Sequence, residues 1–275
     1  MLFCLASGAA FGAMAVFGKL AYAEGATVGT LLALRFLFAS GLFWAGGATR
    51  SLPARRDVLL ALGLGAGGYA VQAGLYFGAL NRIDAGLLSL LVFTFPVIVA
   101  VAAVALGRER LTPRRTAALA IALGGLTLFV GSTGTIDVLG VALGLGAAVV
   151  YAAYILVSEG VAKRMSPLTL AALVCTGAAG ALTAGTILLG QFQPGELTLA
   201  GWWWLLCLAG VSTVAAIALF FAGLARVGPT RSSILATVEP LVTVALAFVI
   251  FGETIGLTGL AGAGLILTAV LLVQT

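Results

Sequence analysis

Ten apolar runs, separated by short polar breaks, fill almost the whole length of the chain. Each run is close to the ~20 residues that an α-helix needs to cross a lipid bilayer. Because the interior of a bilayer offers no partners to backbone N–H and C=O groups, such runs cross it as helices. The sequence therefore predicts an all-α integral membrane protein with ten transmembrane helices. The predicted spans lie near residues 2–22, 28–48, 58–80, 85–106, 115–131, 138–158, 167–190, 201–225, 230–251 and 257–274.

The composition agrees with this prediction and excludes several functions. Hydrophobic residues make up 62% of the 275 residues and charged residues 8%, against roughly 25% charged residues in an ordinary soluble domain. The chain contains no histidine, so His-containing zinc sites and Ser-His-Asp triads are impossible. Its three cysteines stand singly, without the spacing of metal ligands. We therefore expect no enzyme activity, no cofactor and no metal.

The basic residues are distributed unevenly over the polar breaks. Eleven of the fourteen lie in alternate breaks, from Arg50 to Arg231, and cytoplasmic loops of membrane proteins carry such an excess. This predicts a multi-pass protein of the cytoplasmic (inner) membrane with both termini in the cytoplasm. The net charge of +5 then reflects the membrane, and no nucleic-acid partner is expected. Lys19, near the outer end of the first span, is expected to extend to the membrane surface.

The two halves of the chain share one pattern. At an offset of 139 residues the second span matches the seventh, and at an offset of 144 the third and fourth match the eighth and ninth. Five spans is an odd number, so the second copy enters the membrane upside down. This predicts two inverted five-helix repeats, residues 1–131 and 138–275, an arrangement characteristic of secondary transporters. The clearest matches are Arg82 with Arg226, Pro96 with Pro240, and Glu109 with Glu253.

Several spans contain or are followed by short motifs. These are Leu34-Arg35-Phe36, Phe95-Pro96, Glu239-Pro240, Gly107 to Leu111, and Gly252-Glu253. Together with the five-plus-five layout, they resemble the EamA-type branch of the drug/metabolite transporter superfamily over nearly the whole chain. The resemblance implies a cytoplasmic-membrane exporter of metabolites, amino acids or drugs, with a central cavity lined mainly by the first, third, fourth, sixth, eighth and ninth spans.

Two polar-aromatic stripes are the first candidates for a substrate site. Each occupies positions i, i+3 and i+7, which lie on one face of a helix. Hydroxyl or amide groups that faced lipid would lack partners, so these faces should meet protein or a water-filled cavity. Packing between helices explains such stripes as well as stacking on an amphipathic solute does. The stripes are Tyr69, Gln72 and Tyr76 in the third span and Tyr151, Tyr154 and Ser158 in the sixth, with Phe93 and Phe95 as further candidates.

Two charged residues lie deep within predicted spans, and such residues are functional candidates by default. Glu239 can bind a substrate ammonium group, carry a coupling proton, or pair with Arg35. For Arg35 we favour a structural or gating role, because the family pattern carries it whatever the substrate. Pro96 and Pro240 interrupt helical hydrogen bonding and are expected to kink the bundle or to free carbonyl groups near the site.

Glycines are expected to serve close helix packing. Gly63, Gly65 and Gly68 spell GxGxxG, but they lie inside an apolar helix and not after a strand, so a dinucleotide loop is excluded. The run from Gly256 to Gly264 in the tenth span permits packing against the fifth span or against a second copy. A homodimer through glycine-rich helices is therefore a further expectation.

Together these features predict a secondary transporter that exports small amphipathic metabolites by alternating access between the inverted halves. Aromatic or hydrophobic amino acids are the favoured substrates. The alternative is efflux of lipophilic cationic drugs, with or without proton coupling, for which Glu239 would be the cation site. The expected partners are a small-molecule substrate and the lipid bilayer.

Overall fold

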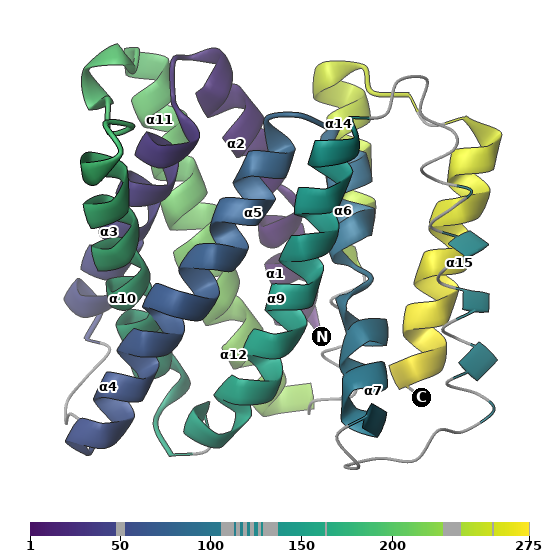
Figure 1. The fold of residues 1–275 in the computed structure, drawn as a ribbon, viewed down its shortest axis with the longest axis horizontal. Coiled ribbons are helices and arrows are strands. Elements are labelled where there is room, and N and C mark those ends of the chain that lie inside the picture. The colour runs from purple at the N-terminus through teal and green to yellow at the C-terminus, as the bar shows by residue number, and fades with distance from the viewer. Residues whose placement is uncertain are drawn as a thin grey trace.

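The computed structural model describes residues 1–47, 53–105, 137–162, 164–227, 238–254 and 256–274, with isolated positions between 113 and 128. Within these ranges every regular element is a helix (Figure 1), which confirms the all-α prediction. Six helical segments are long and apolar enough to cross a membrane, and three more apolar helices are shorter. These nine correspond to nine predicted spans. The fifth, near 115–131, falls largely outside the described residues, so the count of ten remains a prediction.

The described helices follow the predicted spans along the chain. The first half contains α1 (Leu2–Gly12), α2 (Met14–Ala23), α3 (Val28–Ala45), α4 (Arg55–Gly63), η1 (Leu64–Tyr69), α5 (Ala70–Leu80), α6 (Ala85–Val92) and α7 (Phe95–Ala105). The second half contains α9 (Val138–Ala162), α10 (Pro167–Leu188), η2 (Pro194–Glu196), α11 (Leu199–Ala209), η3 (Gly210–Ala215), α12 (Ala216–Val227), α14 (Val238–Phe251) and α15 (Leu257–Gln274).

Hydroxyl side chains begin three of the long helices. Thr27 accepts the N–H of Thr30 at the start of α3, and Ser166 accepts that of Thr169 at the start of α10. Thr198 does the same at the start of α11. The first N–H groups of a helix have no partner within it, so these caps explain why the helices begin at these polar residues.

Several spans are interrupted near their middle. The third contains the π-helical turn η1 and the eighth contains the π-helical turn η3. The first breaks at Ala13, between α1 and α2, and the fourth breaks at Phe93 and Thr94, between α6 and α7. Pro96, the second residue of α7, has no N–H to continue the helix from α6. Such interruptions are frequent at the binding sites of membrane transporters.

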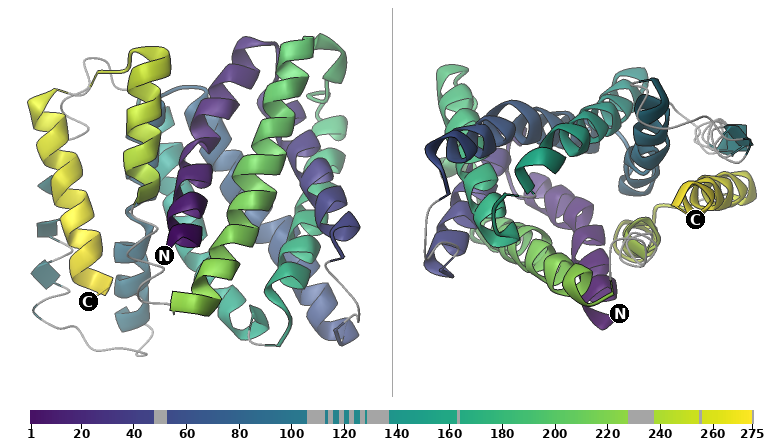
Figure 2. Two further views of the ribbon diagram at one scale, coloured as in Figure 1. Left: turned by 180° about the vertical axis from the view of Figure 1, so that it is seen from behind. Right: turned by 90° about the horizontal axis from the view of Figure 1, so that it is seen from below.

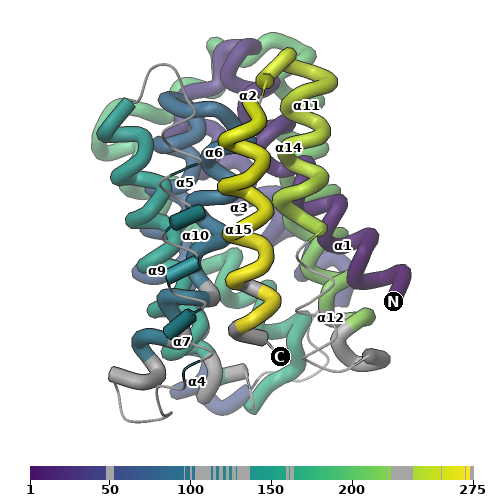
Figure 3. The backbone as a smooth tube through the Cα atoms, turned by 90° about the vertical axis from the view of Figure 1, so that its right-hand side faces the viewer, coloured from purple at the N-terminus to yellow at the C-terminus, as the bar shows by residue number. Residues whose placement is uncertain are grey.

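Contacts between the helices occur in related pairs. α5 packs along α9, as α11 and α12 pack along α2 and α1. α6 and α7 contact α9, as α14 contacts α1. α3 lies along α10, and α14 contacts α6. Exchanging the first five spans with the last five therefore leaves this set of contacts unchanged. α15 lies at one edge of the bundle, beside α7 (Figures 2 and 3).

Glycines let two spans touch backbone to backbone, as the sequence predicted. A Cβ atom on Gly65 would overlap the carbonyl oxygen of Val174, and one on Gly177 would overlap that of Leu62. These glycines hold the third span against α10. In α15, the carbonyl of Gly262 lies against Gly125 of the same chain. That face of the glycine run is thus covered within one copy, and the homodimer remains a prediction.

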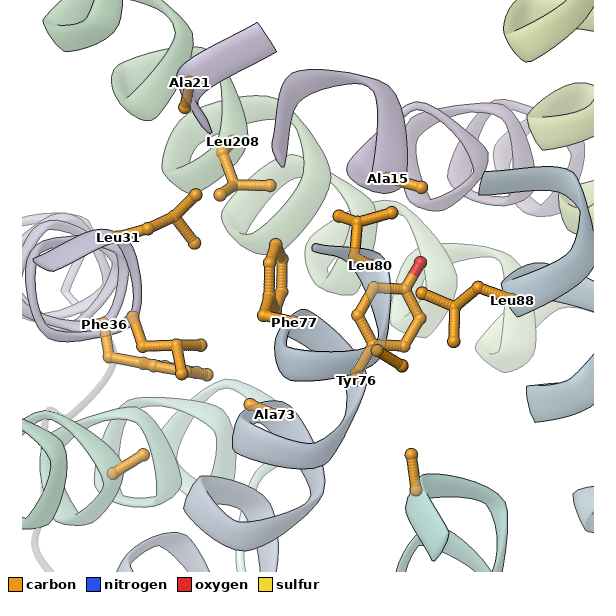
Figure 4. Close-up of a cluster of buried hydrophobic side chains, with 14 of the residues drawn as sticks. Ala15, Ala21, Leu31, Phe36, Ala73, Tyr76, Phe77, Leu80, Leu88 and Leu208 are labelled. Atoms are coloured by element: carbon orange, nitrogen blue, oxygen red, sulfur yellow. The ribbon is translucent and has the colours of Figure 1, made fainter. Parts of the chain in front are cut away.

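A buried core joins α2, α3, α5 and α11 on one side of the bundle. Figure 4 shows Phe77 at its centre, between Leu31, Phe36 and Leu208. All four side chains are fully buried. The core therefore fixes how the second, third and eighth spans pack around the middle of the bundle.

Both chain ends lie in the half of the bundle where α4 begins (Figure 1). We call the opposite end, where α2 and α5 end and α6 begins, the outer end, after the orientation that the basic residues predict. The cytoplasmic position of the two termini stays a prediction.

Lys19 pairs with two carboxylates at the outer end. Its ammonium group lies 2.6 Å from Glu253 and 3.7 Å from Asp84, and its side chain is 22% exposed. Its extension to the membrane surface stays a prediction. Glu253 lies 234 residues further along the chain, so the partner was hidden from sequence reasoning.

Candidate functional site

Six aromatic side chains form one continuous row through the middle of the bundle, which we call the aromatic row. It runs in the order Phe36, Tyr69, Tyr154, Tyr151, Phe95, Phe93. Successive ring centroids are 5.3, 5.7, 6.4, 4.6 and 5.9 Å apart. The row therefore joins α3, η1, α9 and the break between α6 and α7.

Local backbone structure explains two of these contacts. Tyr151 and Tyr154 are three residues apart on α9, so their rings stack nearly parallel, at an angle of 12°. Tyr154 also stacks on Tyr69, the last residue of η1. Its ring lies over the neighbouring Gly68, where a Cβ atom would come within 3.0 Å of it. Because Gly68 has no side chain, the ring of Tyr154 can lie over the π turn and stack on Tyr69.

The rings of the row are not completely covered by protein. Tyr69, Phe95, Tyr151 and Tyr154 are only partly buried, although each lies near the middle of its span. Phe93 is buried. Partly exposed aromatic side chains inside a helical bundle can stack on a flat or apolar solute.

Glu239 brings a carboxylate to this row. It is the second residue of α14 and is partly buried. Its carboxyl group lies close enough to the hydroxyl groups of Tyr69, Tyr76 and Tyr151 for electrostatic coupling. A negative charge in the first turn of a helix also interacts favourably with the helix dipole. The arrangement can bind a positively charged group beside aromatic rings.

Arg35 is held away from that carboxylate. Its side chain is buried, and Nε donates to the hydroxyl oxygen of Thr213 at 2.9 Å. Nη2 lies 3.2 Å from the sulfur of Met14. The guanidinium carbon is 5.0 Å from the ring centre of Phe36 and 5.2 Å from that of Phe77. Arg35 therefore joins four spans, and the alternative in which it pairs with Glu239 is not found.

The other predicted residues lie near the row without extending it. Tyr76 is buried against Phe77, with ring centres 5.1 Å apart, and Gln72 is half-buried on the same helix. Ser158 donates its hydroxyl to the carbonyl of Ile155 in its own helix. Pro240 is buried next to Glu239.

Sequence reasoning missed Phe36 as part of the row. It lies in the motif Leu34-Arg35-Phe36 of the second span, outside the polar-aromatic stripes of the third and sixth spans. Phe36 touches Tyr69 on one side and the guanidinium group of Arg35 on the other. The signal in the sequence was the adjacent Arg35, because a charge buried within a span needs partners such as an aromatic ring.

Known proteins resemble this chain in sequence and in fold. A model of the EamA-like transporter family matches residues 1–131 and 138–275. An uncharacterized transporter of Archaeoglobus fulgidus is 28% identical over 197 residues, which are 72% of this chain and 70% of that protein. A solved crystal structure superposes with a TM-score of 0.69 over 99% of this chain and 96% of its own. Its sequence identity is 21%, so it bears on the fold alone.

Proposed function

We propose a substrate class for this chain, which belongs to the EamA-like transporter family and is a multi-pass membrane transporter of small substrates. Its substrates are small amphipathic solutes that carry an ammonium group. The observation that carries this proposal is the aromatic row with the carboxylate of Glu239 beside it.

The two parts of the site suit the two ends of such a solute. Stacking on an uncovered ring contributes about 0.5–1.5 kcal/mol beyond the burial of apolar surface. A cation next to a carboxylate and to tyrosine rings gains both ion pairing and cation–π attraction. The rings would select the apolar body, and Glu239 would select the positive charge.

Amino acids with aromatic or hydrophobic side chains are the first candidates within this class. Their ammonium group would meet Glu239, and their side chain would lie on the aromatic row. The break between α6 and α7 begins a new helix at Phe95. The N-terminus of an interrupted helix is a favourable place for a substrate carboxylate.

Lipophilic cations are the second candidate, and the position of Arg35 favours them. Because its guanidinium group is bound to Thr213 and Met14, it is not free to meet the carboxylate of an amino acid. A solute with a positive charge and no carboxylate requires only Glu239 and the rings. Both candidates share the ammonium chemistry, and transport assays separate them.

Alternating access between two inverted halves, in the inner membrane and in the direction of export, completes the proposal. It is supported by the paired helix contacts and by the π turns in the third and eighth spans. Interruptions at mid-span give each half a place to bend around a central site.

Uptake into proteoliposomes tests the substrate class. Labelled phenylalanine, leucine, glutamate and a lipophilic cation such as tetraphenylphosphonium are compared, each with and without a pH gradient. We expect flux of the apolar amino acids, of the cation, or of both, and none of glutamate. Tyr154→Ala and Glu239→Gln should reduce that flux at least tenfold, and Trp203→Phe, at a side chain 62% exposed on α11, should not.

Competition decides between the two candidates. Inhibition of amino-acid flux by the cation means that both use one site. Full flux in both site variants, or equal transport of glutamate, would overturn the proposal.

A further inference from the structure

A shielded carboxylate joins three predicted spans at the outer end of the bundle. One oxygen of Glu253, just beyond α14, lies 2.6 Å from the ammonium group of Lys19 on α2. The same carboxylate accepts the N–H groups of Ala85 and Gly86, the first residues of α6, at 3.3 Å. Its side chain is only 11% exposed. The first, fourth and ninth spans are thus held together by one group.

The backbone around Glu253 is shaped for this contact. Gly252 has a φ angle of +66°, a left-handed conformation that glycine adopts without strain. It turns the chain back over α14, so that the N–H of Glu253 donates to the carbonyl of Ala247. The carboxylate then faces the positive end of the α6 dipole. Lys19 also lies 5.5 Å from the ring centre of Phe251.

Lys19 also lies 3.7 Å from the carboxylate of Asp84, whose side chain is 62% exposed. A further ion pair at the outer end is exposed on both sides. Arg82 and Asp137 approach to 3.2 Å at the surface, between the third and sixth spans. The Gly140 N–H and Arg82 hold the pKa of Asp137 below its usual value, so this carboxylate is ionised at neutral pH. Solvent screens this exposed pair far more than the shielded one. It therefore serves as the matched control.

The shielded pair lies between the candidate site and the outside. Glu239 is at the start of α14, and Glu253 follows the end of the same helix. At 1.5 Å per residue the two are separated by roughly 20 Å along the helix axis. A solute at the aromatic row that leaves between the first, fourth and ninth spans must pass the carboxylate of Glu253.

We propose that Lys19, Glu253 and the start of α6 form an outer gate of the transport cycle. When closed, it shuts the outer end while the site is reached from the cytoplasm. When the gate opens, the solute bound at the aromatic row is released to the outside. This inference rests on the proposed function in so far as that function requires alternating access. In an exporter, such a gate stabilises the state in which the site is open to the cytoplasm and binds solute from that side.

A cysteine reporter tests the gate without any substrate. Leu88 is fully buried on α6, one turn beyond the gate and in the same cluster as Tyr76. Leu88→Cys is placed in a chain whose three native cysteines are replaced by alanine. Its reaction with a membrane-impermeant maleimide is then timed from the outer face and from the inner face in oriented vesicles.

Opening the gate should speed the reaction from the outer face. We expect Glu253→Gln and Lys19→Met each to raise that rate at least fivefold, and the double variant to add little more. Lys19→Arg, which keeps the charge, and Asp137→Asn, at the exposed pair, should react as slowly as the parent. Thermal unfolding temperatures in detergent, matched across the variants, exclude a general loss of folding.

Unchanged reaction rates in both gate variants would overturn the proposal. An equal rise in Asp137→Asn, or a rise seen only from the inner face, would do the same. The assay uses no transported solute. It therefore measures the opening of the gate even if none of the compounds in the transport panel is transported. The failure of the gate and the failure of the proposed substrate class are thus distinguishable.

Discussion

The π turns η1 and η3 lie at matching places in the third and eighth spans, yet their side chains differ in kind. η1 ends in Tyr69, whose ring is part of the aromatic row. η3 contains Ser212 and Thr213, which are both fully buried, and Thr213 holds the guanidinium group of Arg35. The same irregularity of the backbone thus carries a partly buried ring of the candidate site in one span and two fully buried hydroxyl residues in the other.

This difference indicates how a symmetric layout can produce an asymmetric site. A π turn widens a helix and turns side chains out of their usual register, but it does not determine what they bind. In η1 the turn presents an aromatic ring, and glycines bring its backbone against α10. In η3 it presents the hydroxyl group of Thr213, which accepts from the buried guanidinium group of Arg35. Substitutions in the two turns should therefore have different consequences.

Gly65→Ala should have the largest effect. The new methyl group would overlap the carbonyl oxygen of Val174 and crowd the backbone nitrogen of Ala178. Because these are backbone atoms of α10, the third span and α10 must separate. Overpacking of this kind costs about 3 kcal/mol. Thermal unfolding in detergent should show a clear loss of stability. Gly67→Ala, in the same turn but with no neighbouring atom within 4 Å, is the control, and equal losses in both would contradict the close contact.

Thr213→Val should be next in size. It removes the oxygen that accepts from Nε of Arg35, and a hydrogen bond to a charged group contributes about 2 kcal/mol. Ser212→Ala changes the neighbouring residue, whose hydroxyl oxygen has no partner among the described residues. That variant should be as stable as the parent or more stable. If both variants lost the same amount of stability, the hydrogen bond to Arg35 would not be the reason for η3.

Tyr69→Leu should act on transport more than on stability. The ring stacks on Tyr154 and meets Phe36 edge-on, and the loss of one stacking surface corresponds to about 1 kcal/mol, or a roughly fivefold higher KM. Tyr69→Phe keeps the ring and should change KM less. Initial rates of uptake over a range of substrate concentrations measure both. A larger effect of Tyr69→Leu on the unfolding temperature than on KM would assign the ring to packing alone.

The smallest effect is expected where the two turns are alike. Gly67 in η1 and Gly210 in η3 both have open space around the position of a Cβ atom. Alanine at either position should raise stability by about 0.5 kcal/mol through its helix propensity. Matched shifts in unfolding temperature would show that the two turns are equivalent as backbone. A loss at one of them would mean that its π geometry requires glycine.

Much of the fold could be predicted because each span is a local property. Length and apolar character indicate that a segment crosses the bilayer, whatever its neighbours are. The helical period placed Tyr151 and Tyr154 on one face, and they do stack. Gly65 was expected to serve close packing, and it does. Each of these predictions needed only residues close together in the chain.

Contacts between spans could not be predicted in the same way. Lipid is as apolar as the helix surfaces, so hydropathy does not indicate which face meets which neighbour. The pairing of Lys19 with Glu253 and the hydrogen bond from Arg35 to Thr213 connect residues 234 and 178 positions apart. The choice of Phe36 as the end of the aromatic row depends on how α3 is rotated against η1.

The sequence by itself therefore determined a helical membrane protein with two similar halves, aromatic helix faces and two deep charges. The tertiary structure decided that six rings form one row, that Arg35 is bound to Thr213 and Met14, and that Glu253 joins three spans at the outer end. The physical reason is that insertion into a bilayer depends on each segment separately, whereas a site between helices depends on their packing.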